Sequence, residues 1–185
     1  MAAKRVRRRL SLISLPVVVG IGLVGIAKLA SWERADLAAD LSAAIAHGES
    51  QRAIEAIHRL TSMANPSITA LVAAADADQS EIAGAGQLAI SRLLYRWEGQ
   101  LEAKQHVRSV ASQVSQLSQA LADRSNEFSA ADEAWLDSTT RKILRLANTI
   151  QPPNSPLVAL NCDAILRSIG TVRPAVALRP TRIDR

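Results

Sequence analysis

The sequence has 185 residues, of which 48% are hydrophobic and only 3% are aromatic. Ala, Leu and Ile supply the apolar content, and this favours packed helices, because strands prefer β-branched and aromatic residues. The formal charge of +5 would suit nucleic-acid binding if it lay on the folded part, but residues 31–169 hold 12 Lys or Arg against 16 Asp or Glu. The positive surplus lies at the two ends of the chain, so the sequence predicts no nucleic-acid partner.

An uncharged stretch over residues 10–27 predicts a transmembrane helix, which we place at residues 10–30. At ~1.5 Å per helical residue the stretch reaches about 27 Å, close to the ~30 Å hydrocarbon core of a bilayer. Lys28 and Trp32 follow it, and both residue types are common at membrane interfaces. The first nine residues hold five Lys or Arg, which predicts a cytoplasmic N-terminus. The rest of the chain would then lie on the periplasmic or other extracytoplasmic side of the cell membrane.

The same residues fit a cleaved export signal as an alternative. Gly25-Ile26-Ala27 could serve as a small-residue cleavage site, and Arg7-Arg8-Arg9-Leu10 resembles a twin-arginine signal. The apolar core of a cleaved signal usually runs for only ~7–15 residues, which is shorter than this stretch. We therefore prefer the retained anchor.

Four helices are predicted between the anchor and residue 97. The first covers residues 32–46 and ends at Gly48, and the second covers residues 50–62. Asn65-Pro66 opens a short third helix, because proline suits the first helical position. Asp78 and Glu81 have the spacing of a capping box that opens a fourth helix. Its apolar stripe comprises Ile82, Gly86, Ala89, Ile90, Leu93 and Trp97.

A faint internal repeat links the second and fourth helices. Ala56, Ile57, Arg59 and Leu60 recur 33 residues later as Ala89, Ile90, Arg92 and Leu93. Periods of this size are typical of helical solenoids. Each copy lies on the second helix of a predicted helix–turn–helix pair.

The segment from Pro66 to Leu93 resembles a HEAT-type repeat, with a proline-opened helix, an Asp-rich turn and a second helix of matching character. The matching residues of that second helix are Ile82, Ala85, Gly86, Ala89, Ile90 and Leu93. Ala83 departs from the family, which usually has an arginine there that pairs with the turn aspartate, so Asp78 lacks this partner. The resemblance covers residues 33–97, two units at most, whereas solenoids generally need three. An unrelated helical-hairpin domain is the alternative.

Residues 99–126 predict one long amphipathic helix with a heptad-like seam. The seam residues are Ala103, Val107, Val110, Val114, Leu117 and Leu121. Packing on neighbouring helices of the same chain is one use of such a seam, and self-association through residues 103–121 is the other.

Two further helices are predicted before the C-terminal end. Ser129 and Asp132 form a second capping-box pattern ahead of an apolar helix. Residues 151–156 read as a loop, after which Ser155-Pro156 starts a helix that ends at Gly170.

The sequence thus predicts an all-α chain in which a transmembrane helix precedes antiparallel hairpins and a long amphipathic helix. Its parts are a basic cytoplasmic tail (1–9), the anchor (10–30), a helical-hairpin region (31–98), a helical bundle region (99–170) and a disordered basic tail (171–185).

No catalytic, cofactor-binding or metal-binding residues are predicted, and no cofactor. His47, His58 and His106 are too far apart for ligand spacing, and Asp76 with Asp78 supplies too few oxygens for a calcium loop. Gly84 and Gly86 lack the strand and lysine of a phosphate loop, so we expect close helix packing there. Cys162, the only cysteine, lies in an apolar helical stretch and is predicted to be buried and inert.

The leading hypothesis is a membrane-anchored helical module that binds or scaffolds another protein and has no catalytic activity of its own. A membrane signalling regulator that acts through its basic cytoplasmic tail is the runner-up. A secreted helical protein, exported by a cleaved signal, and an enzyme of unfamiliar type complete the alternatives.

Overall fold

The computed structural model describes residues 14–150 and 155–170, and side chains from residue 31 to 150 and from 156 to 169. Seven helices and no strand occur in these ranges, which confirms the all-α prediction. Their bounds are α1 (Ser14–His47), α2 (Ser50–Ser62), α3 (Ile68–Ala75), α4 (Ser80–Glu102), α5 (Val107–Arg124), α6 (Glu133–Thr149) and α7 (Ser155–Gly170).

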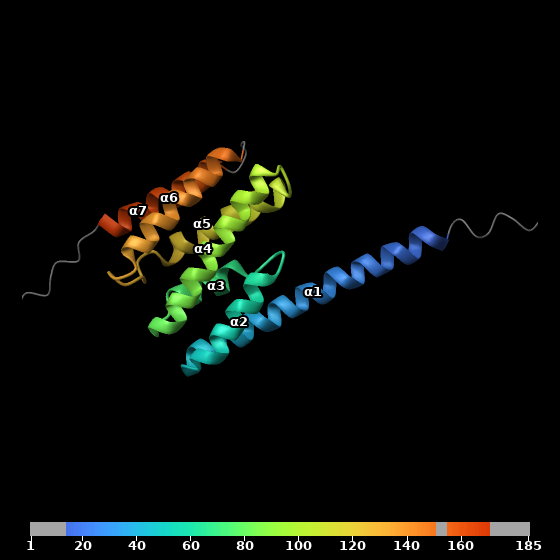
Figure 1. The fold of residues 1–185 in the computed structure, drawn as a ribbon, viewed down its shortest axis with the longest axis horizontal. Coiled ribbons are helices and arrows are strands. Elements are labelled where there is room, and N and C mark those ends of the chain that lie inside the picture. Colours follow the sequence, from blue (N-terminus) through green and yellow to red (C-terminus); the bar gives the residue numbers. More distant parts are fainter. Residues whose placement is uncertain (1–13, 151–154, 171–185) are drawn as a thin grey trace, which may run out of the picture.

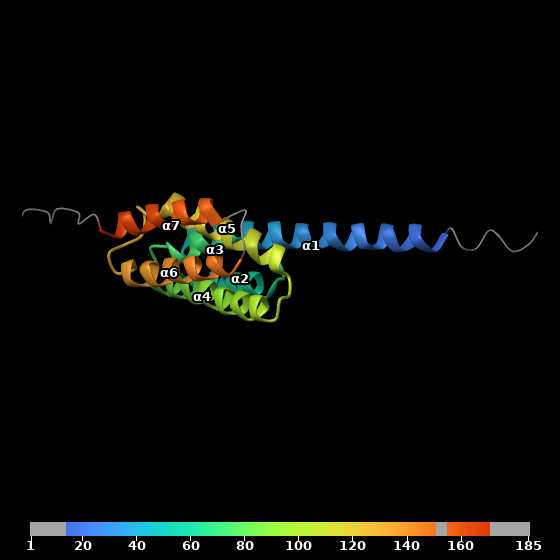
Figure 2. The same ribbon diagram turned by 90° about the horizontal axis from the view of Figure 1, so that it is seen from above.

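The helices form two layers, which Figure 2 shows edge-on. Helices α1, α3, α5 and α7 lie side by side in one layer, and α2, α4 and α6 form the other. Consecutive helices run antiparallel and alternate between the layers (Figure 1). The hairpins α1–α2 and α3–α4 therefore stack on each other, with α1 against α3 and α2 against α4.

Helix α1 is continuous for 34 residues, and its first half projects beyond the other six helices (Figures 1 and 2). Its second half packs on the bundle through Leu37, Leu41 and Ala44. The helix ends at His47, and Gly48 follows with a φ of 69°, which is the left-handed conformation that glycine adopts without strain. The predicted stop at this glycine is thus confirmed.

The predicted membrane span falls outside the described side chains. Residues 10–13 are not described, and residues 14–30 are described by their backbone alone. Among the residues with described side chains, none of the helices combines the length and the apolar character that crossing a bilayer requires. Residues 1–9 and 171–185, predicted as basic tails, also lie outside the described residues.

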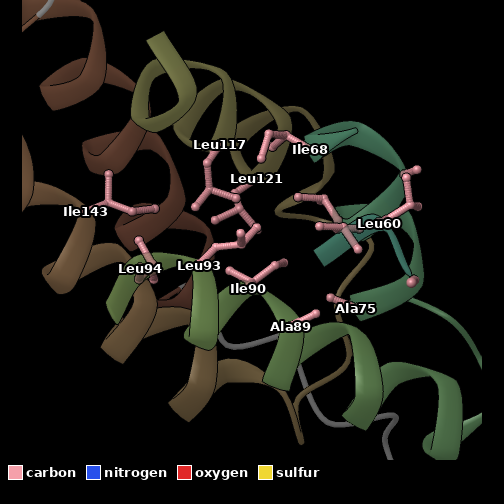
Figure 3. Packing of buried hydrophobic residues seen from close by; sticks show 14 of the residues in the cluster. Leu60, Ile68, Ala75, Ala89, Ile90, Leu93, Leu94, Leu117, Leu121 and Ile143 are labelled. Atoms are coloured by element: carbon pink, nitrogen blue, oxygen red, sulfur yellow. The ribbon is translucent and has the colours of Figure 1, made fainter. Parts of the chain in front are cut away.

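A single core joins the two layers. The second helix has the predicted bounds, and its Ile57 and Leu60 are buried in the same cluster as Ile90 and Leu93 of α4. In Figure 3, the side chains of Ile90 and Leu93 point toward Leu117 of α5, which packs in the same cluster. The boundary drawn between residues 98 and 99 lies inside α4, and the core takes residues from both sides of it.

The prediction of one long helix over residues 99–126 is wrong. Helix α4 continues to Glu102, and α5 starts at Val107 after a tight turn. Every residue from 102 to 109 is exposed, whereas Leu101 and Val110 are buried. A straight helix would carry α5 away from the bundle, so burial of its apolar face requires the chain to reverse direction here.

The heptad seam faces the interior of the chain. Val110, Val114, Leu117 and Leu121 are buried, and α5 packs against α3 and α7. Ala103 in the turn and Val107 at the start of α5 are exposed, so these two predicted seam residues do not belong to the buried seam. A coiled coil between two chains through this seam would require the fold to open.

The predicted starts of α3, α4, α6 and α7 are correct to within a few residues, but their caps differ, and the helix predicted from residue 32 is the second half of the continuous α1. No side-chain cap forms at α4, because Gln79 rather than Asp78 holds the N-cap position. Ser129 does bind Asp132, with its backbone N–H and its hydroxyl both donating to Oδ2, yet α6 begins only at Glu133. The last helix has its predicted bounds.

Candidate functional site

Helix α4 lies at the centre of its layer and presents two different faces. Its predicted stripe is buried, including Ile90, Leu93 and Trp97. On the other side, Leu88 is 50% exposed and Tyr95 is 68% exposed. The two exposed residues are seven positions apart and thus lie on one side of the helix. Large exposed apolar and aromatic side chains are typical of protein-binding surfaces.

Tyr95 is held in place by a charged neighbour from α6. The Nζ of Lys142 lies 3.1 Å from the centroid of the Tyr95 ring, and the same ammonium pairs with Glu98 at 2.9 Å. The ammonium is attracted by the negative face of the ring, typically by about 0.5–1 kcal/mol at an exposed site. Lys142 therefore fixes the ring in an exposed position between α4 and α6. We call Leu88, Tyr95, Glu98 and Lys142 the α4 face.

The sequence patterns did not predict the α4 face. They assigned Leu93 and Trp97 to the core, correctly, but gave no role to Tyr95 between them. The available signal was the position of Tyr95 and Leu88 opposite the buried stripe. An apolar residue there has no core to enter and stays on the surface of the helix.

The two arginines of α4 differ in their contacts with the rest of the chain. Arg92 is exposed and makes no hydrogen bond or ion pair with the described part of the chain, so its side chain is solvated. Arg96 is exposed too, but its guanidinium donates to the carbonyl oxygens of Thr61 at 2.8 Å and Met63 at 3.3 Å. These carbonyls end α2 without helical partners, so Arg96 satisfies them.

A polar cluster occupies the opposite end of the bundle, at the α3–α4 turn. The guanidinium of Arg124, from the end of α5, donates to Oδ2 of Asp76 at 3.2 Å. Gln87 of α4 donates to Oδ1 of Asp132 at 2.6 Å and links the start of α6 to the same region. The HEAT resemblance pointed to Asp78 as the turn aspartate, but Asp78 is exposed and Asp76 makes the ion pair.

The surroundings of Asp76 raise its pKa from 3.8 to about 6. Burial is the largest cause, a hydrogen bond with Glu127 adds to it, and the charge of Arg124 opposes it. The folded state therefore holds a proton at Asp76 more tightly than the unfolded chain does. Such a carboxyl could exchange protons near neutral pH, but it makes a structural ion pair with no nucleophile or metal ligand beside it.

Asp76 should make the fold more stable at mildly acidic pH. Lowering the pH from 7 to 5 is expected to raise the free energy of unfolding by about 1 kcal/mol, because the folded state takes up the proton first. This gain disappears as the pH rises through the folded pKa. Urea unfolding at both pH values measures it. Asp76→Asn should abolish the gain, and Asp78→Asn, an exposed change in the same turn, should keep it. Equal pH responses in wild type and Asp76→Asn would contradict the assignment.

The remaining candidate residues do not come together. His47, His58 and His106 are exposed on α1, on α2 and in the α4–α5 turn. Over the described ranges, no group of His, Cys, Asp and Glu side chains has the arrangement of a metal site. Cys162 is buried on α7 as predicted, and burial raises the pKa of its thiol to about 11, so the reactive thiolate is disfavoured.

No protein-family model, curated protein or solved structure matches the chain. The resemblance to HEAT repeats therefore stays a prediction from the residues quoted above, and function has to be argued from the surfaces of the bundle.

Proposed function

We propose that the chain is a membrane-anchored, all-helical protein-binding or scaffold module with its bundle on the non-cytoplasmic side of the cell membrane. The observation that carries the proposal is the continuity of α1. One unbroken helix runs from Ser14 through the uncharged stretch and into the core at Leu37. The 17 residues before Ser31 form a helix about 25 Å long, which projects from the bundle where nothing else in the described chain covers it.

The first described side chains after this projecting segment suit a membrane interface. Trp32 is 75% exposed, and indole rings concentrate at the level of the lipid head groups. Glu33, the next residue, already pairs with Arg59 of α2 at 3.7 Å, so the contact between α1 and α2 begins directly beyond this level. The positive charges of residues 1–9 would then keep the N-terminus in the cytoplasm.

The α4 face is the surface we assign to a protein partner. Helical stacks usually bind through the exposed side of one helix layer, and the α4 face lies at the centre of the α2–α4–α6 layer. The stacked α1–α2 and α3–α4 hairpins support a HEAT-like interpretation of residues 33–97. Tyr95 gives this surface an aromatic contact of a type that often dominates binding energy at interfaces, and Leu88 adds apolar area beside it.

Two other functions compete with the membrane-anchored binding module. They differ from it in the segment that binds the partner or in attachment to the membrane. A signalling regulator would act through the basic tail, and a secreted protein would lose its N-terminal segment. Affinity purification with residues 2–9 deleted separates the first from our proposal: partners that remain bound place binding in the bundle. A mature chain that lacks residues 1–27 would favour the secreted protein.

The anchor is tested by adding charge to the uncharged stretch. Val18→Arg with Val24→Arg should abolish retention in carbonate-washed membranes, because each central charge costs roughly 2.5–3.5 kcal/mol on insertion scales. Gln51→Arg with Ser138→Arg, at two exposed positions of the bundle, adds the same charge and should leave retention intact. Immunoblots of the washed membranes, with N-terminal sequencing, measure both. Retention of the Val18 and Val24 double variant would overturn the anchor.

A further inference from the structure

The two ends of the bundle carry opposite charge. The α1–α2, α3–α4 and α5–α6 turns lie at the end away from the projecting half of α1, and the α2–α3 and α4–α5 turns lie at the near end (Figures 1 and 2). The far turns, at residues 47–50, 76–81 and 123–133, hold eight Asp or Glu and one Arg. The near turns, at residues 62–67 and 101–108, hold one Glu, one Lys and one Arg. The acidic character thus lies away from the proposed membrane.

The positive charge of the near end is concentrated in the α4–α5 turn. We call residues 102–108 the basic tip, and all of them are exposed. Lys104 and His106 have positive φ angles of 55° and 53°, a left-handed backbone conformation that non-glycine residues rarely adopt. Val107 adds an exposed apolar side chain between His106 and Arg108. The basic tip thus presents Lys104 and Arg108, against the single carboxylate of Glu102, beside an exposed valine. This combination suits contact with a surface that is both anionic and apolar.

Contacts between helices place the basic tip along α1. Arg59 near the end of α2 pairs with Glu33, and Arg96 binds the carbonyls of Thr61 and Met63 just beyond it. From Arg96, α4 continues for six residues to Glu102, which is about 9 Å of helix. A length of about 9 Å along α1 from Glu33 toward the N-terminus reaches Ala27, the last residue of the uncharged stretch. The end of α4 therefore lies level with Ala27.

Contacts of α5 independently place the basic tip at the same level along α1. Its Gln113 donates to Oδ1 of Asn65 at 2.8 Å, so the α2–α3 turn lies beside the second turn of α5. Val107 begins α5 six residues before Gln113, and the start of this helix lies further toward the projecting half of α1 (Figure 1). The basic tip is therefore the part of the bundle that reaches furthest along the proposed anchor.

We propose that the basic tip lies in the head-group layer of the membrane and binds anionic phospholipid through Lys104 and Arg108. This inference rests on the proposed function, since α1 must first be inserted. Anionic lipid is the occupant that the geometry favours, because the tip is level with the end of the uncharged stretch and carries the opposite charge. With α1, it gives the bundle a second point of attachment and orients the acidic far end and the α4 face relative to the membrane.

The test uses the full-length chain with Gln105→Cys, labelled with a fluorophore and reconstituted into vesicles. The vesicles contain equal parts of phosphatidylcholine and phosphatidylglycerol with a lipid that carries a nitroxide quencher on its head group. Gln51→Cys, an exposed position at the far end, is the matched control, and the wild-type chain measures background labelling of the buried Cys162. We expect quenching of the label at position 105 and none at position 51.

Charge reversal tests the lipid chemistry. Each Lys or Arg near an anionic surface strengthens binding by roughly fivefold, so Lys104→Glu with Arg108→Glu should reduce the ratio of bound to free tip by about thirtyfold or more. Quenching should then fall to the level at position 51. Lys104→Gln with Arg108→Gln should reduce it in the same direction, and it provides the measurement if the double Glu variant does not fold.

Flotation of the same samples separates the two proposals. Chains that float with the vesicles but show no quenching at position 105 would overturn the lipid contact and leave the anchor standing. Equal quenching in vesicles of phosphatidylcholine alone would overturn recognition of anionic lipid. Chains that do not float at all would refute the anchor, and the lipid contact with it.

Discussion

Gly86→Ala is expected to destabilise the bundle by about 3 kcal/mol, the upper part of the usual range for overpacking a core. A Cβ atom at this position would lie 2.5 Å from the backbone nitrogen of Ala75 and 2.7 Å from the carbonyl carbon of Ala74. Both atoms belong to the backbone of α3 and cannot move as a flexible side chain would. The two helices must therefore separate, and the buried cluster that α3 shares with α4 would lose packing.

Gly84→Ala is the matched control in the same helix. A Cβ atom at Gly84 would meet nothing within 4 Å, and alanine is the better helix former by up to about 1 kcal/mol. Urea unfolding of the chain from residue 31 onward should therefore show one variant weakened and the other unchanged or strengthened. The reverse order would mean that α4 packs on α3 in a different register.

The sequence analysis expected close helix packing at both glycines, and only Gly86 has it. The stripe that predicted the buried face of α4 already contained Gly86, together with Ile82, Ala89 and Ile90. Gly84 lies off that stripe, so the helical period alone could have separated the two. Periodicity identified the buried face correctly, but it could not indicate that a backbone would approach Gly86 so closely.

Helix boundaries were predicted well where residues at the boundary itself mark the start or the end of the helix. Gly48 ends α1, and Ser155-Pro156 begins α7 at the residue expected. The turn at residues 103–106 could not be predicted in this way, because it contains no glycine or proline and the apolar period continues through it. Only the position of the rest of the core requires the chain to reverse there.

The surfaces were harder to predict than the core. Arg124 and Asp76 are 48 residues apart, and no local pattern pairs them. The same holds for Arg96 and the end of α2, which are 35 residues apart at Thr61. Long-range polar contacts depend on how helices stack, and a single sequence gives the faces of helices but not their neighbours.

Ile90→Ala is expected to cost roughly 2–5 kcal/mol, the usual penalty for emptying a buried aliphatic site. Ile90 is fully buried on α4 and points into the cluster formed with α2 and α5 (Figure 3). Its equivalent in the internal repeat, Ile57, belongs to the same cluster. Loss of the side chain would therefore leave a cavity that both hairpins line. The cavity can close only if one of the hairpins moves.

Arg92→Ala gives the comparison that tests this register. Arg92 follows Ile90 by two positions and points to solvent, so its removal should change the free energy of unfolding by no more than about 0.5 kcal/mol. Thermal and urea unfolding of the chain from residue 31 onward measures both variants. A large loss at Ile90 with almost none at Arg92 is the expected pattern, since only the isoleucine lies between the two layers. Similar losses of unfolding free energy at both positions would mean that α4 presents a different face to the core. The two hairpins would then not stack as described.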